Sequence, residues 1–140
     1  TLRIAARLGL SVEVVPGITS LQVLCAAHAI PLNDLGAPVV VTTGRRLREG
    51  GWPAGADTVV VMLDAGGAFE VLDPAGLQIW WGACLGLPQQ ALDAGPLAEA
   101  GPRILATRAA LRQAHGWVMD VYLLRREAER EVQPGDRPQG

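Results

Sequence analysis

Two short runs rich in β-branched residues, 38–43 (PVVVTT) and 58–62 (TVVVM), constrain the fold of this chain more than any other feature. Each run is the length of one strand. The second is apolar throughout, which is typical of a strand buried on both faces of a sheet. Sheets covered on both faces are a hallmark of α/β proteins, so the sequence predicts an α/β domain.

The rest of the chain supplies further strands and the helices that would cover them. Strands are predicted at 12–15, 78–85 and 117–124, with another short one within 86–95. Helices are predicted at 1–8, 68–75 and 103–114, and from a cap at Thr19 or Ser20 to Ala27, whereas 44–55 is predicted to be a long loop. We interpret 1–36 as the remnant of one α/β domain with a linker, 37–126 as a second domain and 127–140 as a polar tail. Since Thr1 falls inside a helical pattern, we expect the front of the first domain to be missing.

Composition excludes several kinds of chemistry. All twelve basic residues are arginine, so neither a P-loop lysine nor a Schiff-base lysine is available. A net charge of −2 argues against general nucleic-acid binding. The two cysteines and two histidines lack the spacing of a metal site, and the unpaired cysteines favour a reducing, cytoplasmic location. No apolar run approaches the ~18 residues of a membrane span, so no membrane association is expected.

Candidate ligand-binding residues follow the predicted strands. Ligands of open α/β sheets bind beyond the carboxyl ends of strands. Small or polar residues stand at four such ends: Thr19 and Ser20, then Arg45 and Arg46, then Met62 to Asp64, and then Gly82 and Ala83. Such residues let a ligand approach the backbone, and the start of a helix at Thr19 would suit an anionic group.

Each of these groups also has an ordinary structural explanation. Thr19 can simply cap a helix, Met62 can fill the core and Gly82 can mark a bulge. Three arginines of the predicted loop could form a solvated face, or could bind several carboxylates because guanidinium groups pair with them bidentately: Arg45, Arg46 and Arg48. The residues alone therefore indicate an α/β ligand-binding protein without an assigned reaction.

The order of these motifs resembles the tetrapyrrole methylase family. The stretches that carry the resemblance are VVPGITS (14–20), IPLN (30–33), VVVTTGRRLREG (39–50), VVVMLDAGGAF (59–69), IWWGACLGLPQQALDAGPL (79–97) and GWVMDVYLLRR (116–126). Members of this family have two α/β domains with S-adenosylmethionine in the cleft between them. The resemblance implies the C-terminal portion of that fold, a mixed sheet flanked by helices, with the N-terminal domain largely missing.

The resemblance also implies roles for individual residues. Those matching cofactor-binding positions of the family are Thr19, Ser20, Met62, Leu63, Gly82 and Ala83, with Gly116 and Trp117 near the same pocket. The chain departs from the pattern of the most similar subgroup in two places, since Cys84 stands where an aromatic residue is expected and Gln89-Gln90 stand where an acidic one is expected.

That subgroup transfers a methyl group from S-adenosylmethionine to a ring carbon of precorrin-5 and releases acetate, giving precorrin-6A for cobalamin biosynthesis. The resemblance implies this reaction and a homodimer. Arg45, Arg46 and Arg48 would then bind the acetate and propionate groups of the tetrapyrrole. The sequence indicates no catalytic residue, and we expect the 140-residue chain alone to be inactive.

Two other functions stay open on the sequence. One is methylation of a different tetrapyrrole, such as another corrin intermediate or uroporphyrinogen. The other is a non-catalytic module that binds a ligand or forms a dimer. An oxidoreductase fits less well, because no GxGxxG motif follows any predicted strand.

Overall fold

A computed structural model describes residues 2–127 of the chain. Its elements, in chain order, are α1 (Leu2–Arg7), α2 (Ser20–Ala27), β1 (Val39–Thr43), α3 (Gly44–Gly50), β2 (Thr58–Met62), the 3₁₀ turn η1 (Ala68–Val71), β3 (Leu77–Ala83), β4 (Ala91–Pro96), α4 (Leu97–His115) and β5 (Asp120–Arg126). The polar tail predicted at 127–140 lies outside the described residues except for its first residue.

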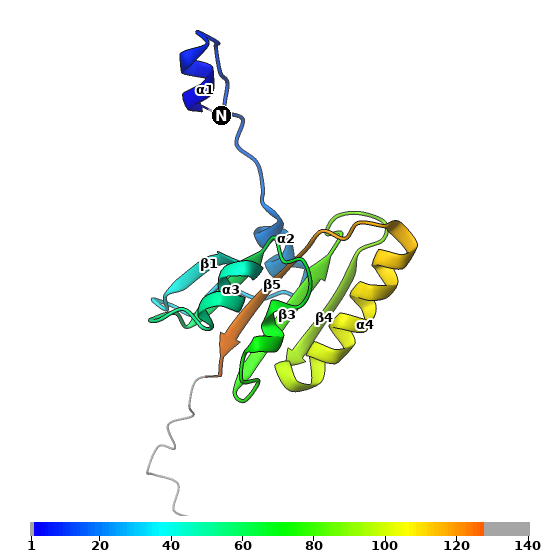
Figure 1. The fold of residues 1–140 in the computed structure, drawn as a ribbon. Coiled ribbons are helices and arrows are strands. Elements are labelled where there is room, and N and C mark those ends of the chain that lie inside the picture. The colour runs from blue at the N-terminus through cyan, green and yellow to red at the C-terminus, as the bar shows by residue number, and fades with distance from the viewer. Residues whose placement is uncertain (1, 128–140) are drawn as a thin grey trace, which may run out of the picture.

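The five strands form one mixed sheet in the order β1-β2-β5-β3-β4 (Figure 1). β1 and β2 are parallel, whereas β5 is antiparallel to both of its neighbours and β4 is antiparallel to β3. Helices flank this sheet, which confirms the predicted fold class. The boundaries of β2 match the prediction, and the short strand predicted within 86–95 is β4.

Each face of the sheet has its own hydrophobic cluster. On one face, α3, η1 and α4 pack over the larger cluster, whose members include Leu47, Ile79, Trp81 and Ile104. On the other face, α2 packs over a smaller cluster centred on Leu24. The apolar residues of β2 divide between the two clusters, which explains why this strand reads as continuously hydrophobic.

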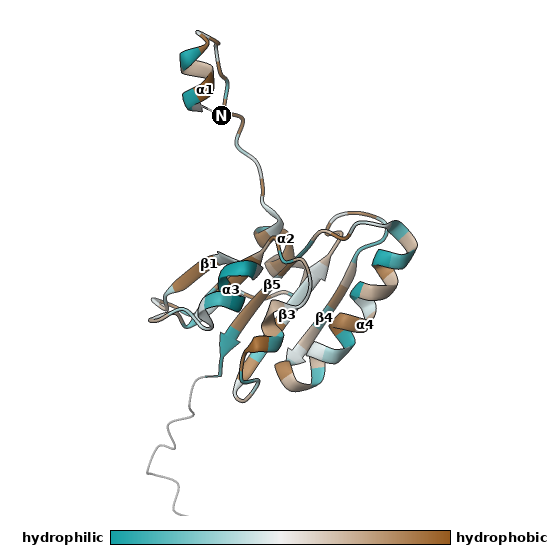
Figure 2. Cartoon of the chain, in the orientation of Figure 1, coloured by the Kyte–Doolittle hydropathy of each residue, from teal (hydrophilic) through white to brown (hydrophobic). Residues whose placement is uncertain are grey.

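The segment predicted as a loop at 44–55 begins instead with α3, so that prediction was wrong. The Thr43 hydroxyl accepts a hydrogen bond from the Arg46 N–H at 3.4 Å and so caps the helix. Leu47 on the inner face is 1% exposed, and Gly51 ends the helix with a φ of 65°. Figure 2 shows that most of α3 is hydrophilic, so its amphipathic pattern rests on this one leucine.

Helix α4 starts six residues before the predicted start at Arg103 and contains Pro102. A proline inside a helix costs about 3 kcal/mol, which is why the sequence favoured a later start. The buried residues that precede the predicted start are Leu97, Ala100 and Gly101, and Leu97 and Ala100 belong to the larger hydrophobic cluster. Their burial against the sheet offsets the cost of the proline.

The predicted strand at 12–15 does not form. Residues 10–19 have no regular secondary structure, and Val12, Val14 and Val15 are all exposed. In Figure 1 this segment runs away from the sheet and ends in α1. A strand needs a partner to satisfy its backbone groups, and the described residues provide none for this segment.

No helix among residues 2–127 combines the length and the apolar character that crossing a membrane would require.

Candidate functional site

Three strands of the sheet, β1, β2 and β3, have their carboxyl ends on the same side of the sheet, which we call the edge of the site. β1 and β2 are parallel, and β2 and β3 both run antiparallel to β5, so their carboxyl ends lie together. Val121 of β5 is paired with Met62 on one side and with Gly82 on the other. Residues paired in this way point to the same face of a sheet, so Met62 and Gly82 share the face covered by α2, about 10 Å apart.

Gly82 brings α2 close to this edge. A Cβ at Gly82 would lie 2.9 Å from a methyl carbon of Leu24 on the helix, and His28 Nε2 donates a hydrogen bond to the Trp81 carbonyl at 2.9 Å. At Gly82 a close neighbour is thus a side chain of α2, and the predicted approach of a ligand to this backbone stays a prediction. Ala83, the next residue, points to the opposite face and is fully buried in the larger cluster.

The N-terminus of α2 is closed by a capping box. Gln22 N–H donates to the Thr19 hydroxyl at 3.5 Å, and Thr19 N–H donates to the Gln22 side chain at 2.8 Å. Thr19 and Ser20 are both exposed. Thr19 is thus a helix cap, as its ordinary explanation requires, while Ser20 opens the helix.

The residue after Met62 adopts an unusual backbone conformation. Leu63 has a φ of 52° and its side chain is 74% exposed. A residue other than glycine in the left-handed region costs about 1–3 kcal/mol, and such strain persists only where the surroundings enforce it. The chain therefore holds this apolar side chain outward, directly beyond the carboxyl end of β2.

Leu63 lines a hollow of about 220 Å³ at the same edge. Residues from the end of α4 and the start of β5 complete its walls: Arg108, Arg112 and the segment 116–120. Trp117 and Met119 are exposed apolar side chains there. The structure thus brings Leu63 together with Gly116 and Trp117, whereas Thr19, Ser20, Met62 and Gly82 do not line this hollow.

A buried carboxylate, Asp64, anchors the turn that follows Leu63. Its side chain is 2% exposed and accepts four hydrogen bonds, from Arg48, Tyr122 and the N–H groups of Gly66 and Ala68. The sequence indicated Asp64 only as one of the residues that follow the predicted strand at 58–62. The turn sequence Asp-Ala-Gly-Gly is a local signal, but the donors on α3 and β5 are 16 and 58 residues away.

These contacts also set the protonation states of the two buried acids. Burial alone would raise the pKa of Asp64, but the hydrogen bonds from Ala68, Gly66, Tyr122 and Arg48 outweigh it and leave the pKa below its usual value. Burial raises the pKa of Tyr122 far above its ordinary range, and the negative charge of Asp64 adds to the increase. Asp64 is therefore ionised at neutral pH, and Tyr122 acts as a hydrogen-bond donor to it.

A second buried carboxylate, Asp120, lies at the start of β5. It accepts hydrogen bonds from Arg108 Nε at 2.9 Å and from Trp81 Nε1 at 3.0 Å. Arg108 also donates to the backbone carbonyl of Asp64 at 3.0 Å. Together the two carboxylates join β2, β3, β5, α3 and α4 at the edge of the sheet.

The three arginines predicted to bind carboxylates lie on α3, next to this edge. Arg48 Nη2 donates to Asp64 and to the Gly66 carbonyl, both at 2.7 Å, so this guanidinium already has internal partners. Arg45 lies 3.8 Å from Glu49 in an exposed pair. The Arg46 side chain forms no hydrogen bond or ion pair with residues 2–127 and is exposed.

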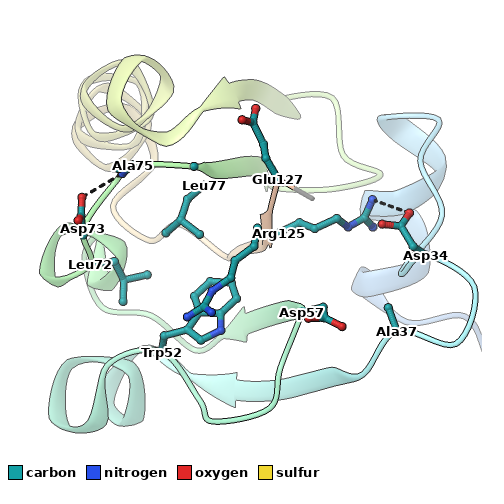
Figure 3. Close-up of a pocket in the computed structure, with 12 residues that line it drawn as sticks. Asp34, Ala37, Trp52, Asp57, Leu72, Asp73, Ala75, Leu77, Arg125 and Glu127 are labelled. Atoms are coloured by element: carbon teal, nitrogen blue, oxygen red, sulfur yellow. Dashed lines mark hydrogen bonds and ion pairs between the residues drawn. The ribbon is translucent and has the colours of Figure 1, made fainter. Parts of the chain in front are cut away.

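A larger hollow of about 790 Å³ lies at the opposite edge of the sheet (Figure 3). Trp52, Leu72 and Leu77 line it, with Arg125 and Arg126 at the end of β5. None of the predicted site residues contributes to it. Within the part of the chain that the structure describes, no three His, Cys, Asp or Glu side chains are grouped to hold a metal ion.

Residues 1–101 match the sequence model of the Tetrapyrrole (Corrin/Porphyrin) Methylases. The chain belongs to this family. The matched residues extend from the N-terminal segment through strands β1 to β4 and end in the first turns of α4.

One relative with a named activity is similar to most of this chain. Over 117 residues the chain is 52% identical to precorrin-6A synthase [deacetylating] from Sinorhizobium sp. The alignment covers 84% of this chain and 44% of the relative. The chain therefore spans less than half the length of that enzyme.

Solved structures agree with the fold. A protein from Corynebacterium diphtheriae described as related to cobalamin synthesis (CobF) superposes with a TM-score of 0.82 at 39% identity, covering 91% of this chain and 54% of that one. Uroporphyrin-III C-methyltransferase from Thermus thermophilus superposes with a TM-score of 0.62 at 23% identity, and a second structure of this enzyme, complexed with S-adenyl homocysteine, with 0.53 at 22%. Both cover 88% of this chain, with 55% and 56% of the Thermus chains. These two likenesses concern the fold alone.

Proposed function

We propose that the protein carrying this chain is an S-adenosylmethionine-dependent C-methyltransferase of cobalamin biosynthesis. Its substrate is precorrin-5, which it methylates with release of acetate to give precorrin-6A. The observation that carries the proposal is the 52% identity with precorrin-6A synthase [deacetylating] across 84% of the chain. Since the chain spans 44% of that enzyme, the proposal concerns the whole protein.

The cofactor-binding part of the proposal rests on the edge where β1, β2 and β3 end. Met62 and Gly82 flank Val121 there, and α2 packs against Gly82 with Thr19 and Ser20 at its start. Leu63 and Trp117 line the small hollow beside them. We assign Thr19, Ser20, Met62, Leu63, Gly82 and Ala83 to cofactor binding, with Ala83 acting through its backbone because its side chain is buried in the core.

The side chains of this edge suit binding and orientation. When bound, S-adenosylmethionine supplies an electrophilic methyl group, and the electron-rich macrocycle is the nucleophile. The residues described here would align the two reactants and exclude water, and alignment can lower a barrier by about 7–11 kcal/mol in favourable cases. The substrate carries several carboxylates, and Arg46 is the arginine of α3 whose side chain has no partner among residues 2–127.

The family resemblance extends the proposal to the setting of the enzyme. We place it in the cytoplasm as a homodimer whose partners are the tetrapyrrole and the cofactor. Gel filtration with light scattering of the whole protein checks the dimer, and a single monomeric species would contradict it.

An activity assay tests the proposal directly. The whole protein is incubated with S-adenosylmethionine and either precorrin-5, another corrin intermediate or uroporphyrinogen, and products are identified by mass spectrometry. We expect methylation of precorrin-5 together with loss of a two-carbon unit. Methylation of one of the other substrates in its place would identify a different tetrapyrrole methyltransferase.

Calorimetry separates an enzyme from a non-catalytic module. A competent site should bind S-adenosylhomocysteine with a Kd of micromolar or tighter, about −8 kcal/mol. The 140-residue chain alone should bind it weakly and catalyse nothing. Methylation by this chain alone would contradict the proposed need for further sequence.

A further inference from the structure

Asp64 is one of the buried groups of this edge that the proposed function does not use. It follows Leu63 directly, and its side chain is enclosed by α3, η1 and β5. Oδ1 accepts hydrogen bonds from Arg48 at 2.7 Å and from Gly66 N–H at 3.1 Å. Oδ2 accepts from Ala68 N–H at 2.6 Å and from the Tyr122 hydroxyl at 2.9 Å. Both oxygens of the carboxylate are therefore fully engaged.

The backbone of the same residue is also fixed. Arg108 Nη2 donates to the Asp64 carbonyl at 3.0 Å, and Arg108 is itself held by Asp120. On the other side, Gly44 begins α3, and a Cβ there would overlap the Asp64 carboxylate. The absence of a side chain at Gly44 lets α3 approach the carboxylate closely enough for Arg48 to reach it.

These contacts act on the residue that precedes Asp64. Leu63 has a φ of 52°, a conformation that leucine rarely adopts without support. With the Asp64 side chain and carbonyl both held, the chain can join β2 to this turn only along a restricted path. Leu63 then projects to the rim of the small hollow, beside the segment 116–119.

We propose that Asp64 is a positioning residue for cofactor binding, which holds Leu63 in its left-handed conformation and so sets the position of the Met62–Leu63 segment. The effect on cofactor binding rests on the proposed function. The effect of Asp64 on the conformation of Leu63 rests on the contacts described above. Asp64 acts through Leu63.

The first arm of the test needs no ligand. Asp64→Asn in the whole protein replaces one acceptor oxygen with an NH₂ group, which faces either Arg48 and Gly66 or Ala68 and Tyr122, all of which are donors. We expect Leu63 to leave the positive-φ region, as seen by crystallography or backbone chemical shifts. A Leu63 that keeps its conformation in the variant would overturn the proposal.

The second arm measures binding of S-adenosylhomocysteine by calorimetry, well below the melting temperature. Asp64→Asn should weaken binding at least 10-fold and should raise the KM for S-adenosylmethionine more than it lowers kcat. The matched control is Asp93→Asn, which disrupts the ion pair between Asp93 and Arg103, with 2.7 Å between Oδ1 and Nη2. This pair is not part of the turn at Leu63. Both variants should melt earlier, but Asp93→Asn should bind the ligand normally.

Two outcomes separate this inference from the function on which it rests. Unmodified protein that does not bind S-adenosylhomocysteine would contradict the cofactor site, and the conformation of Leu63 would still decide the role of Asp64. If Asp64→Asn binds S-adenosylhomocysteine within twofold of the unmodified protein, Asp64 only stabilises the fold.

A second variant applies if Asp64→Asn fails to fold. Tyr122→Phe removes a single hydrogen-bond donor to Asp64, and we expect it to lower the affinity for S-adenosylhomocysteine about threefold. Unchanged affinity in that variant would also overturn the proposal.

Discussion

Arg108 and Asp120 form an ion pair inside the protein, with 2.9 Å between Nε and Oδ2 and side-chain exposures of 12% and 5%. The pair connects the middle of α4 to the first residue of β5. Because Asp120 also accepts from Trp81, and Arg108 also donates to the Asp64 carbonyl, the pair belongs to a network that spans the edge of the sheet. Removing one partner would leave a buried charge without compensation.

Replacing Arg108 should therefore destabilise the protein strongly. We expect Arg108→Met to lower the free energy of unfolding by roughly 3 kcal/mol, as typically found when one partner of a buried pair is removed. Urea unfolding monitored by tryptophan fluorescence measures the loss. Arg103→Met is the matched control on the same helix, since Arg103 pairs with Asp93 but is 51% exposed and should matter much less. Equal losses in the free energy of unfolding would show that the buried pair stabilises the protein no more than the exposed one.

Gly44 should tolerate no side chain. The Cβ of Gly44→Ala would overlap the Asp64 carboxylate, which cannot move without losing its four hydrogen bonds. We expect a loss of about 1–3 kcal/mol in the free energy of unfolding, as for other overpacked sites. Gly50→Ala on the same helix has no atom within 4 Å of the new Cβ and should be neutral or slightly stabilising. Thermal unfolding of both variants tests this contrast, and a stable Gly44→Ala protein would contradict the close packing seen here.

Tyr122 should make stability fall at high pH. Its pKa is raised in the folded state, so the folded protein keeps the phenol proton at pH values where the unfolded chain loses it. The stabilisation is complete below about pH 10, the ordinary tyrosine pKa, and is lost as the pH rises above it. Tyr122 is the only tyrosine in the chain, so phenolate absorbance should appear only when the 140-residue chain unfolds. Phenolate formation near pH 10 in the folded chain would contradict the burial of this hydroxyl.

The sequence predicted the strands of the sheet better than the helix α3 and the N-terminal segment outside the sheet. The strand β2 was predicted to the residue because its continuous apolar run has no alternative as a helix or turn at that length. Helix α3 was missed because most of its residues are polar and its amphipathic pattern rests on Leu47 alone, whose burial comes from tertiary packing; the cap at Thr43 is local but was not used. The strand predicted at 12–15 failed for a related reason, since β propensity cannot replace a missing partner strand.

The sequence indicated candidate residues for the site, but it did not indicate the contacts that hold them in place. Residues at the ends of β1, β2 and β3 could be identified by their order along the chain, and the sheet places Met62 and Gly82 on either side of Val121. The strand predicted before Thr19 and Ser20 does not form. The partners of Asp64 come from α3, η1 and β5, and no local pattern joins residues so far apart. Roles in cofactor and substrate binding therefore stay predictions that mutation must test.

Arg46 offers the sharpest test of substrate recognition. Arg48 is engaged by Asp64 and Arg45 lies near Glu49, whereas the Arg46 side chain has no partner among residues 2–127. If Arg46 binds a carboxylate of the tetrapyrrole, Arg46→Ala in the whole protein should raise the KM for precorrin-5 by roughly 10- to 150-fold, as expected for loss of a charged hydrogen bond of about 1.5–3 kcal/mol. Binding of S-adenosylhomocysteine should be unchanged, because no described contact of Arg46 reaches the turn at Leu63. Arg45→Ala is the control for a general loss of positive charge on α3, and an equal effect of both substitutions would indicate long-range attraction. An unchanged KM in Arg46→Ala would remove this arginine from the substrate site.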